Sequence, residues 1–136
     1  MKPITQEWLN RARDDLDVVG EIIDIAHLTN ITAFHCQQAI EKSFKAILEE
    51  HNKVVPRVHN LVRLYNIVKD KLNFMVDELT LKEISDIYTE ARYPGELGLV
   101  PYGKPTIQDA ERFYDTAKTV YNDVSSLLAS EQEASG

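Results

Sequence analysis

The stretch Asn30–His51, NITAFHCQQAIEKSFKAILEEH, decides the fold of this chain. Its apolar residues recur at steps of three and four, which is the spacing of one helix face and not of a strand. The expected buried stripe comprises Ala33, Cys36 or Gln37, Ile40, Phe44 and Ile47, with Leu48 beside it. The spacing therefore predicts an amphipathic helix over this range, with Asn30 as its N-cap.

The segment before it, from about Thr5 to about His27, repeats the helical periodicity. The residues expected to face inward are Trp8, Ala12, Leu16, Val19, Ile23 and Ala26. Charged residues cover the other face, and the pair Asp14–Asp15 is assigned to that polar face without a special role. These residues predict a second amphipathic helix that packs on the first.

Three further helices are expected after Pro56, which disfavours helical backbone at the residue before it. A short helix spans Leu61 to Leu72, and the capping box Thr80–Glu83 opens the next one. That helix should end near Arg92, because Pro94 and Gly95 follow directly. Thr106 is expected to cap the last helix.

The fold class predicted from these segments is all-α, an up-and-down bundle of four main helices plus a short additional helix. The 136 residues fit one domain, residues 1–136, with a core over about 5–128 and a polar tail at 129–136 that should fray. The loop 92–105 is long enough to be a candidate functional loop.

The composition of the chain excludes some classes of protein and disfavours some kinds of binding. Hydrophobic residues make up 43% of the chain, but no apolar run is long enough to span a membrane, and the N-terminus has no signal-like apolar core. The single cysteine, Cys36, is expected to be a core residue and not a nucleophile, so a cytoplasmic location is predicted. The net charge of −7 disfavours non-specific binding of nucleic acid.

Four polar residues of the Asn30–His51 helix share one face: His35, Gln38, Lys42 and Lys45. Two lysines, a glutamine and a histidine could bind a phosphate or the edge of a nucleobase. The alternative is a solvated face on which Glu41 pairs with Lys45, four residues away.

Two features outside that helix are further candidates. His59 stands at the start of the third helix, where it either caps backbone amides or belongs to a site. Arg92, at the end of the fourth helix, either stabilises the helix terminus or holds phosphate, with Tyr93 beside it as a stacking surface.

Other kinds of site have no support in the sequence. The histidines at 27, 35, 51 and 59 do not fall at metal-ligand spacing on one helix. The chain also has no Gly-rich phosphate loop and no nucleophile elbow. No metal and no cofactor are therefore expected.

The candidate residues occur within motifs that resemble the HEPN domain. In order, these are Trp8 with Ala12 and Asp15–Leu16, then FHCQQAIEKSFKA at 34–46, then His59–Asn60–Leu61, then Tyr88 and Arg92–Tyr93–Pro94. The similarity extends over about 5–128. It implies a helical bundle that usually dimerises, and chains of this kind are often encoded beside a small nucleotidyltransferase in toxin–antitoxin-like pairs.

The same resemblance implies nucleotide binding, and in some branches metal-independent RNase activity. Those RNases carry an arginine followed, after four to six residues, by a histidine. Here the positions after Arg92 are Leu97, Gly98 and Leu99, and no other arginine of the chain has a histidine at that spacing. RNase activity through the usual motif is therefore not expected.

Three hypotheses follow. The first is a module that dimerises, pairs with a nucleotidyltransferase and binds nucleotide, RNA or phosphate through Arg92, Tyr93, His59, Lys42, Lys45, His35 and Gln38. The second is an RNase toxin in which His59 acts as acid or base and Arg92 stabilises the developing charge. In the third, the polar face binds a protein partner and no small ligand.

Overall fold

Helices make up most of residues 1–92 and 104–135, which are the residues that the computed structural model describes. They are α1 (Pro3–Ile22), α2 (Thr29–Glu50), α3 (Leu61–Val68), α4 (Glu78–Arg92) and α5 (Ile107–Ser135), with 3-10 turns at Ala26–Leu28 and Lys69–Lys71. No strand occurs within these two ranges, so the predicted all-α class is confirmed. None of the described helices has the length and apolar character needed to cross a membrane.

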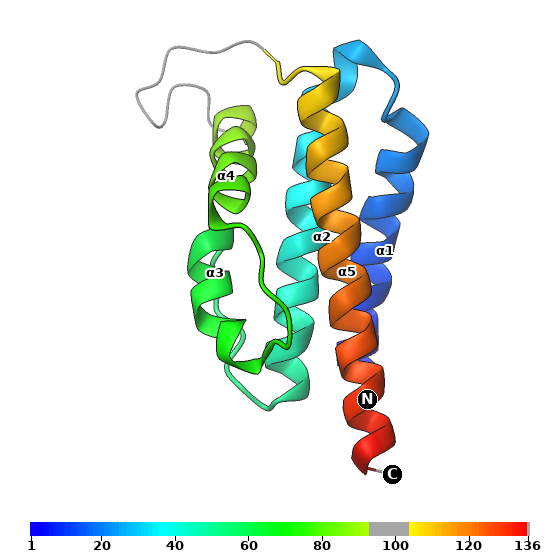
Figure 1. The fold of residues 1–136 in the computed structure, drawn as a ribbon, viewed down its shortest axis with the longest axis vertical. Helices are drawn as coiled ribbons and strands as arrows, with labels where there is room; N and C mark the ends of the chain where they lie inside the picture. Colours follow the sequence, from blue (N-terminus) through cyan, green and yellow to red (C-terminus); the bar gives the residue numbers. More distant parts are fainter. Residues whose placement is uncertain (93–103, 136) are drawn as a thin grey trace.

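Helix α2 is the centre of the bundle and packs against α1, α3, α4 and α5 (Figure 1). The four long helices run alternately up and down. Helices α3 and α4 lie on one side of α2 and α1 lies on the other, with little contact between α1 and α4. One face of α2 therefore lies between α1 and α4, which make little contact with each other.

The core forms where the apolar stripe of α2 meets its neighbours. Every residue of the predicted stripe is buried: Ala33, Cys36, Gln37, Ile40, Phe44, Ile47 and Leu48. In α1 the predicted Ala12, Leu16 and Val19 are also buried. Ala26 is exposed, because α1 already ends at Ile22.

The starts of two helices differ from the sequence predictions. Asn30 lies inside α2, which begins at Thr29 directly after a 3-10 turn and has no side-chain cap. Thr80 lies inside α4, where its hydroxyl donates to the carboxylate of Asp77, 2.9 Å away. Asp77 Oδ1 accepts from the backbone N–H of Leu79 at 3.2 Å and so serves as the cap.

The last helix begins as predicted. Thr106 Oγ1 accepts from the backbone N–H of Asp109 at 3.0 Å, and Asp109 Oδ2 accepts from the backbone N–H of Thr106 at 3.1 Å. This reciprocal pair satisfies two amides that have no partner within the helix. The predicted polar tail belongs to α5, which continues to Ser135.

Candidate functional site

The polar face of α2 lies opposite the apolar stripe that fills the core. His35, Gln38 and Lys42 are partly exposed on it, whereas Lys45 is only 5% exposed. Steps of three and four residues place all four side chains along one side of the helix. Two buried carboxylates, one on α1 and one on α2 itself, contact His35, Lys42 and Lys45.

The first carboxylate is Asp15, on the α1 side of this face. Asp15 Oδ1 lies 2.8 Å from His35 Nδ1, and Oδ2 accepts from Lys42 Nζ at 2.7 Å. A carboxylate only accepts hydrogen bonds, so this contact assigns the proton of the neutral imidazole to Nδ1. The prediction that Asp15 lies with Asp14 on the polar face of α1 is wrong: Asp15 is only 7% exposed. Asp15 is next to Leu16, at the edge of the buried stripe of α1. The contacts with His35 and Lys42 compensate for the loss of its hydration.

The second carboxylate is Glu41, on the α3 and α4 side. It is 4% exposed and accepts from Lys45 Nζ at 3.0 Å and from Gln37 Nε2 at 3.0 Å. Its Oε1 also lies 2.9 Å from His59 Nδ1. The predicted Glu41–Lys45 pair therefore exists, but it is buried and does not belong to a solvated face.

Two glutamines join this cluster to the chain around it. Gln37 Nε2 donates to the backbone carbonyl of His59 at 2.8 Å, and Gln38 Nε2 donates to Gln37 Oε1 at 2.7 Å. His59 is thus held through both its ring and its backbone, although 53% of its side chain is exposed. The residue lies just before α3, where Asn60 caps the helix by accepting from the backbone N–H of Arg63.

Aromatic rings border the polar groups. Phe34 stacks on Tyr88 of α4 with ring centroids 5.4 Å apart, and its edge meets His35 at 5.2 Å. Tyr88 also lies 6.1 Å from the ring of His59. On the α1 side, Lys45 Nζ is 5.8 Å from the ring centroid of Trp8. Such rings restrict the rotamers of the histidines and the lysine.

A model of the HEPN domain matches residues 5–127, most of the chain. The chain belongs to the HEPN domain family. Among solved structures it is similar to TT1696 from Thermus thermophilus, with a TM-score of 0.74 and 22% identity over 90% of this chain and 97% of that one. At that identity the likeness supports the fold alone. No curated protein sequence matches the chain.

The HEPN structure brings His35, Gln38, Lys42, Lys45 and His59 to the same region of α2. Arg92 is the last residue of α4, one turn after Tyr88. The side chain of Arg92, together with Tyr93 and the rest of the loop to residue 103, lies outside the described residues.

Sequence reasoning missed three residues of this candidate site: Asp15, Gln37 and Glu41 as anchors of the two histidines. Two signals pointed to Asp15 and Gln37. Asp15 borders an apolar stripe, where a charged residue is normally buried only with a partner. Gln37 falls within the stripe of α2, where a buried amide must find hydrogen bonds.

Cys36 of the HEPN core is fully buried, as predicted. Burial, assisted by the negative charge of Asp15, raises the pKa of its thiol to about 12. The thiol is therefore protonated at neutral pH and is not a nucleophile. Within the described ranges, no three His, Cys, Asp or Glu side chains are grouped so that they could hold a metal ion.

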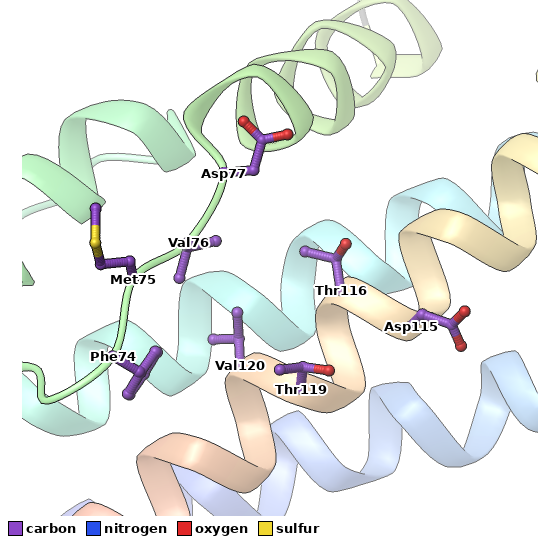
Figure 2. A pocket seen from close by; sticks show the side chains of 8 residues that line it. All are labelled: Phe74, Met75, Val76, Asp77, Asp115, Thr116, Thr119 and Val120. Atoms are coloured by element: carbon purple, nitrogen blue, oxygen red, sulfur yellow. The ribbon is translucent and has the colours of Figure 1, made fainter.

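A hollow of about 240 Å³ lies elsewhere, between the α3–α4 connection and α5 (Figure 2). It is lined by Phe74, Met75, Val76, Asp77, Asp115, Thr116, Thr119 and Val120. None of these eight lining residues, all of which the structure describes, is a cation, and two are carboxylates. The hollow shares no residue with the polar face of α2 and does not suit a phosphate.

Proposed function

We propose that this HEPN domain, as a single unit over residues 1–136, is a binding module that holds a nucleotide, an RNA end or another phosphate-bearing ligand over the polar face of α2. The observation that carries the proposal is the pair of carboxylate–histidine contacts, Asp15–His35 and Glu41–His59, at 2.8 and 2.9 Å. With Nδ1 occupied by a carboxylate, each ring has Nε2 left for a ligand.

The roles of the remaining residues follow from their chemistry. Lys42 and Gln38, both partly exposed, offer N–H donors to phosphate or base oxygens, whereas the buried Lys45 supports the site through Glu41. Arg92 and Tyr93 would add a cation and a stacking ring at the end of α4. We further propose a homodimer in the cytoplasm, with a small nucleotidyltransferase as partner in a toxin–antitoxin-like pair.

A thermal-shift screen against mono-, di- and triphosphate nucleotides tests ligand binding. A ligand present at 100 times its Kd adds about 2.7 kcal/mol to the free energy of unfolding, which a melting curve resolves. We expect a selective rise in Tm that is lost in Arg92→Ala while the Tm of the free variant stays near that of the parent. Arg13→Ala is the matched control, since Arg13 is exposed on α1 and pairs with Asp17; it should keep the shift.

No rise in Tm with any nucleotide would contradict the binding proposal, and a large loss of stability in free Arg92→Ala would make Arg92 structural. Native mass spectrometry of the chain, alone and co-expressed with the product of its neighbouring gene, tests the dimer and the partner. A monomer under both conditions would exclude both assemblies and would also remove the protein-docking alternative.

A second candidate is a metal-independent RNase with a non-standard pair, His59 and Arg92. The Glu41–His59 contact favours it, because a carboxylate on Nδ1 orients an imidazole whose Nε2 can act as base and then as acid. Toxicity on expression that disappears in His59→Ala would support this function. Failure of the purified protein to cleave any RNA would exclude it.

A further inference from the structure

Two lysines and two carboxylates lie at the polar face of α2, and their formal charges sum to zero when His35 and His59 are neutral. Lys42 Nζ is 2.7 Å from Asp15 Oδ2, and Lys45 Nζ is 3.0 Å from Glu41 Oε2. Each ammonium thus already has a carboxylate in contact, and the two pairs together carry no net charge. Lys42 can still donate an N–H to an incoming anion, but the charge of each lysine is already balanced by its carboxylate, so the net electrostatic attraction is small.

The two imidazoles can change this balance. Each already contacts a carboxylate through Nδ1, so a ring that gains a proton on Nε2 keeps its contact and becomes a cation. Both rings reach solvent, with 25% of the His35 side chain and 53% of the His59 side chain exposed. Protonation therefore adds positive charge at the surface of the site without breaking its internal pairs.

We propose that anion binding at this face is coupled to proton uptake by His35 and His59, so that the site binds a phosphate dianion more tightly when these imidazoles are protonated. This inference rests on the proposed function, since it concerns the same site. The ligand class is a terminal phosphate, an anion that accepts charge-assisted hydrogen bonds from imidazolium N–H groups.

The groups around each ring are consistent with this coupling. His35 faces Asp15 from α1 and has Lys42 and Phe34 near it on α2. His59 faces Glu41, with Lys45 on the same carboxylate, and Tyr88 from α4. Arg57 precedes His59 by two residues on the same connection. A bound anion would offset the repulsion between a newly formed imidazolium and these cations.

Sulfate is the probe for the experiment, because it stays a dianion from about pH 6 to about pH 8 and only the protein titrates. Its Kd is measured by NMR titration at both pH values at constant ionic strength. Coupling to histidine protonation should make sulfate bind at least about ten-fold more tightly at the lower pH. The double variant His35→Gln/His59→Gln should lose this difference. His27→Gln, which alters an exposed histidine of the 3-10 turn, should keep it.

Equal sulfate affinity at both pH values, or a pH dependence that survives in His35→Gln/His59→Gln, would overturn the coupling. Absence of sulfate binding at both pH values would overturn it as well. The nucleotide thermal-shift screen separates the two proposals: nucleotide binding with a pH-independent sulfate Kd leaves the binding function intact and removes only the coupling. The native 1H–15N spectrum of the double variant checks that it remains folded.

Discussion

Asp15 of α1 and His35 of α2, twenty residues apart, are joined by a contact of 2.8 Å between Oδ1 and Nδ1. The same carboxylate accepts from Lys42, so one buried charge links α1 to two turns of α2. Because Asp15 is 7% exposed, it contributes both to the helix interface and to the candidate site. Its removal should therefore change stability and anion affinity in opposite directions.

Asp15→Asn should lower the free energy of unfolding and raise the affinity for sulfate near pH 8. The amide keeps the shape of the side chain but leaves Lys42 without an anion, at a cost of about 1–3 kcal/mol. The freed ammonium then becomes available to the ligand. Urea denaturation and the sulfate titration measure the two effects. Asp14→Asn, at the exposed neighbouring position, is the control and should change neither by much; equal effects of both variants would contradict the role given to Asp15.

Glu41→Gln should destabilise the protein more than any substitution of an exposed ion pair. Glu41 contacts Lys45, Gln37 and His59, and the Lys45 side chain is only 7% exposed, so the variant leaves a buried ammonium unpaired. We expect a loss of about 3–5 kcal/mol in urea denaturation.

Lys82–Asp86 provides the matched control, since it has the same spacing of four residues but side chains that are 67% and 39% exposed. Asp86→Asn should cost less than about 0.5 kcal/mol. Similar losses in Glu41→Gln and Asp86→Asn would show that burial of the Glu41–Lys45 pair has no energetic consequence.

The fold could be predicted from the sequence because the apolar spacing of α2 fixes its buried face and Pro94 and Gly95 follow the end of α4. Helix starts were harder to predict where several side chains could cap. Asp77 precedes Thr80 by three residues, and the path of the chain selects Asp77: the Tyr65 hydroxyl accepts from the backbone N–H of Val76 and fixes the approach to α4.

The candidate site could be predicted only in part. Helical spacing is enough to place His35 and Lys42 on one face. The burial of Asp15 depends on groups 20 and 27 residues away, and the position of His59 depends on Glu41, 18 residues earlier. Such contacts arise from the packing of helices against one another, and they cannot be predicted from the periodicity of a single segment.

Thr106→Ala should lower the free energy of unfolding by about 1 kcal/mol, because the hydroxyl caps α5 through the backbone N–H of Asp109.

The second hydrogen bond of this cap, from the backbone N–H of Thr106 to the carboxylate of Asp109, makes the cap sensitive to acid. Donation from the backbone N–H of Thr106 is the main cause that lowers the pKa of Asp109, and Arg112 adds to it. A carboxylate whose pKa is lower in the folded state stabilises above its unfolded pKa, and that stabilisation is lost as the pH falls through the folded pKa.

Asp109→Asn should therefore show a smaller loss of stability between neutral pH and about pH 3 than the parent protein, by urea denaturation at each pH. Asp115→Asn is the control, since the Asp115 side chain is 78% exposed. An acid-induced loss in Asp109→Asn as large as that of the parent would contradict the contribution of this cap.

Cys36 should resist thiol reagents as long as the protein is folded. Burial first, and the nearby negative charge of Asp15 second, raise the pKa of the thiol to about 12, so almost no thiolate exists at about pH 8. Ellman's reagent should therefore leave the native protein unmodified and react with one thiol per chain in urea. In the native protein the slow rate of modification should follow the unfolded population, and the destabilised Glu41→Gln should react faster than Asp86→Asn. Stoichiometric modification of the folded parent within minutes would contradict the burial of Cys36 in the core.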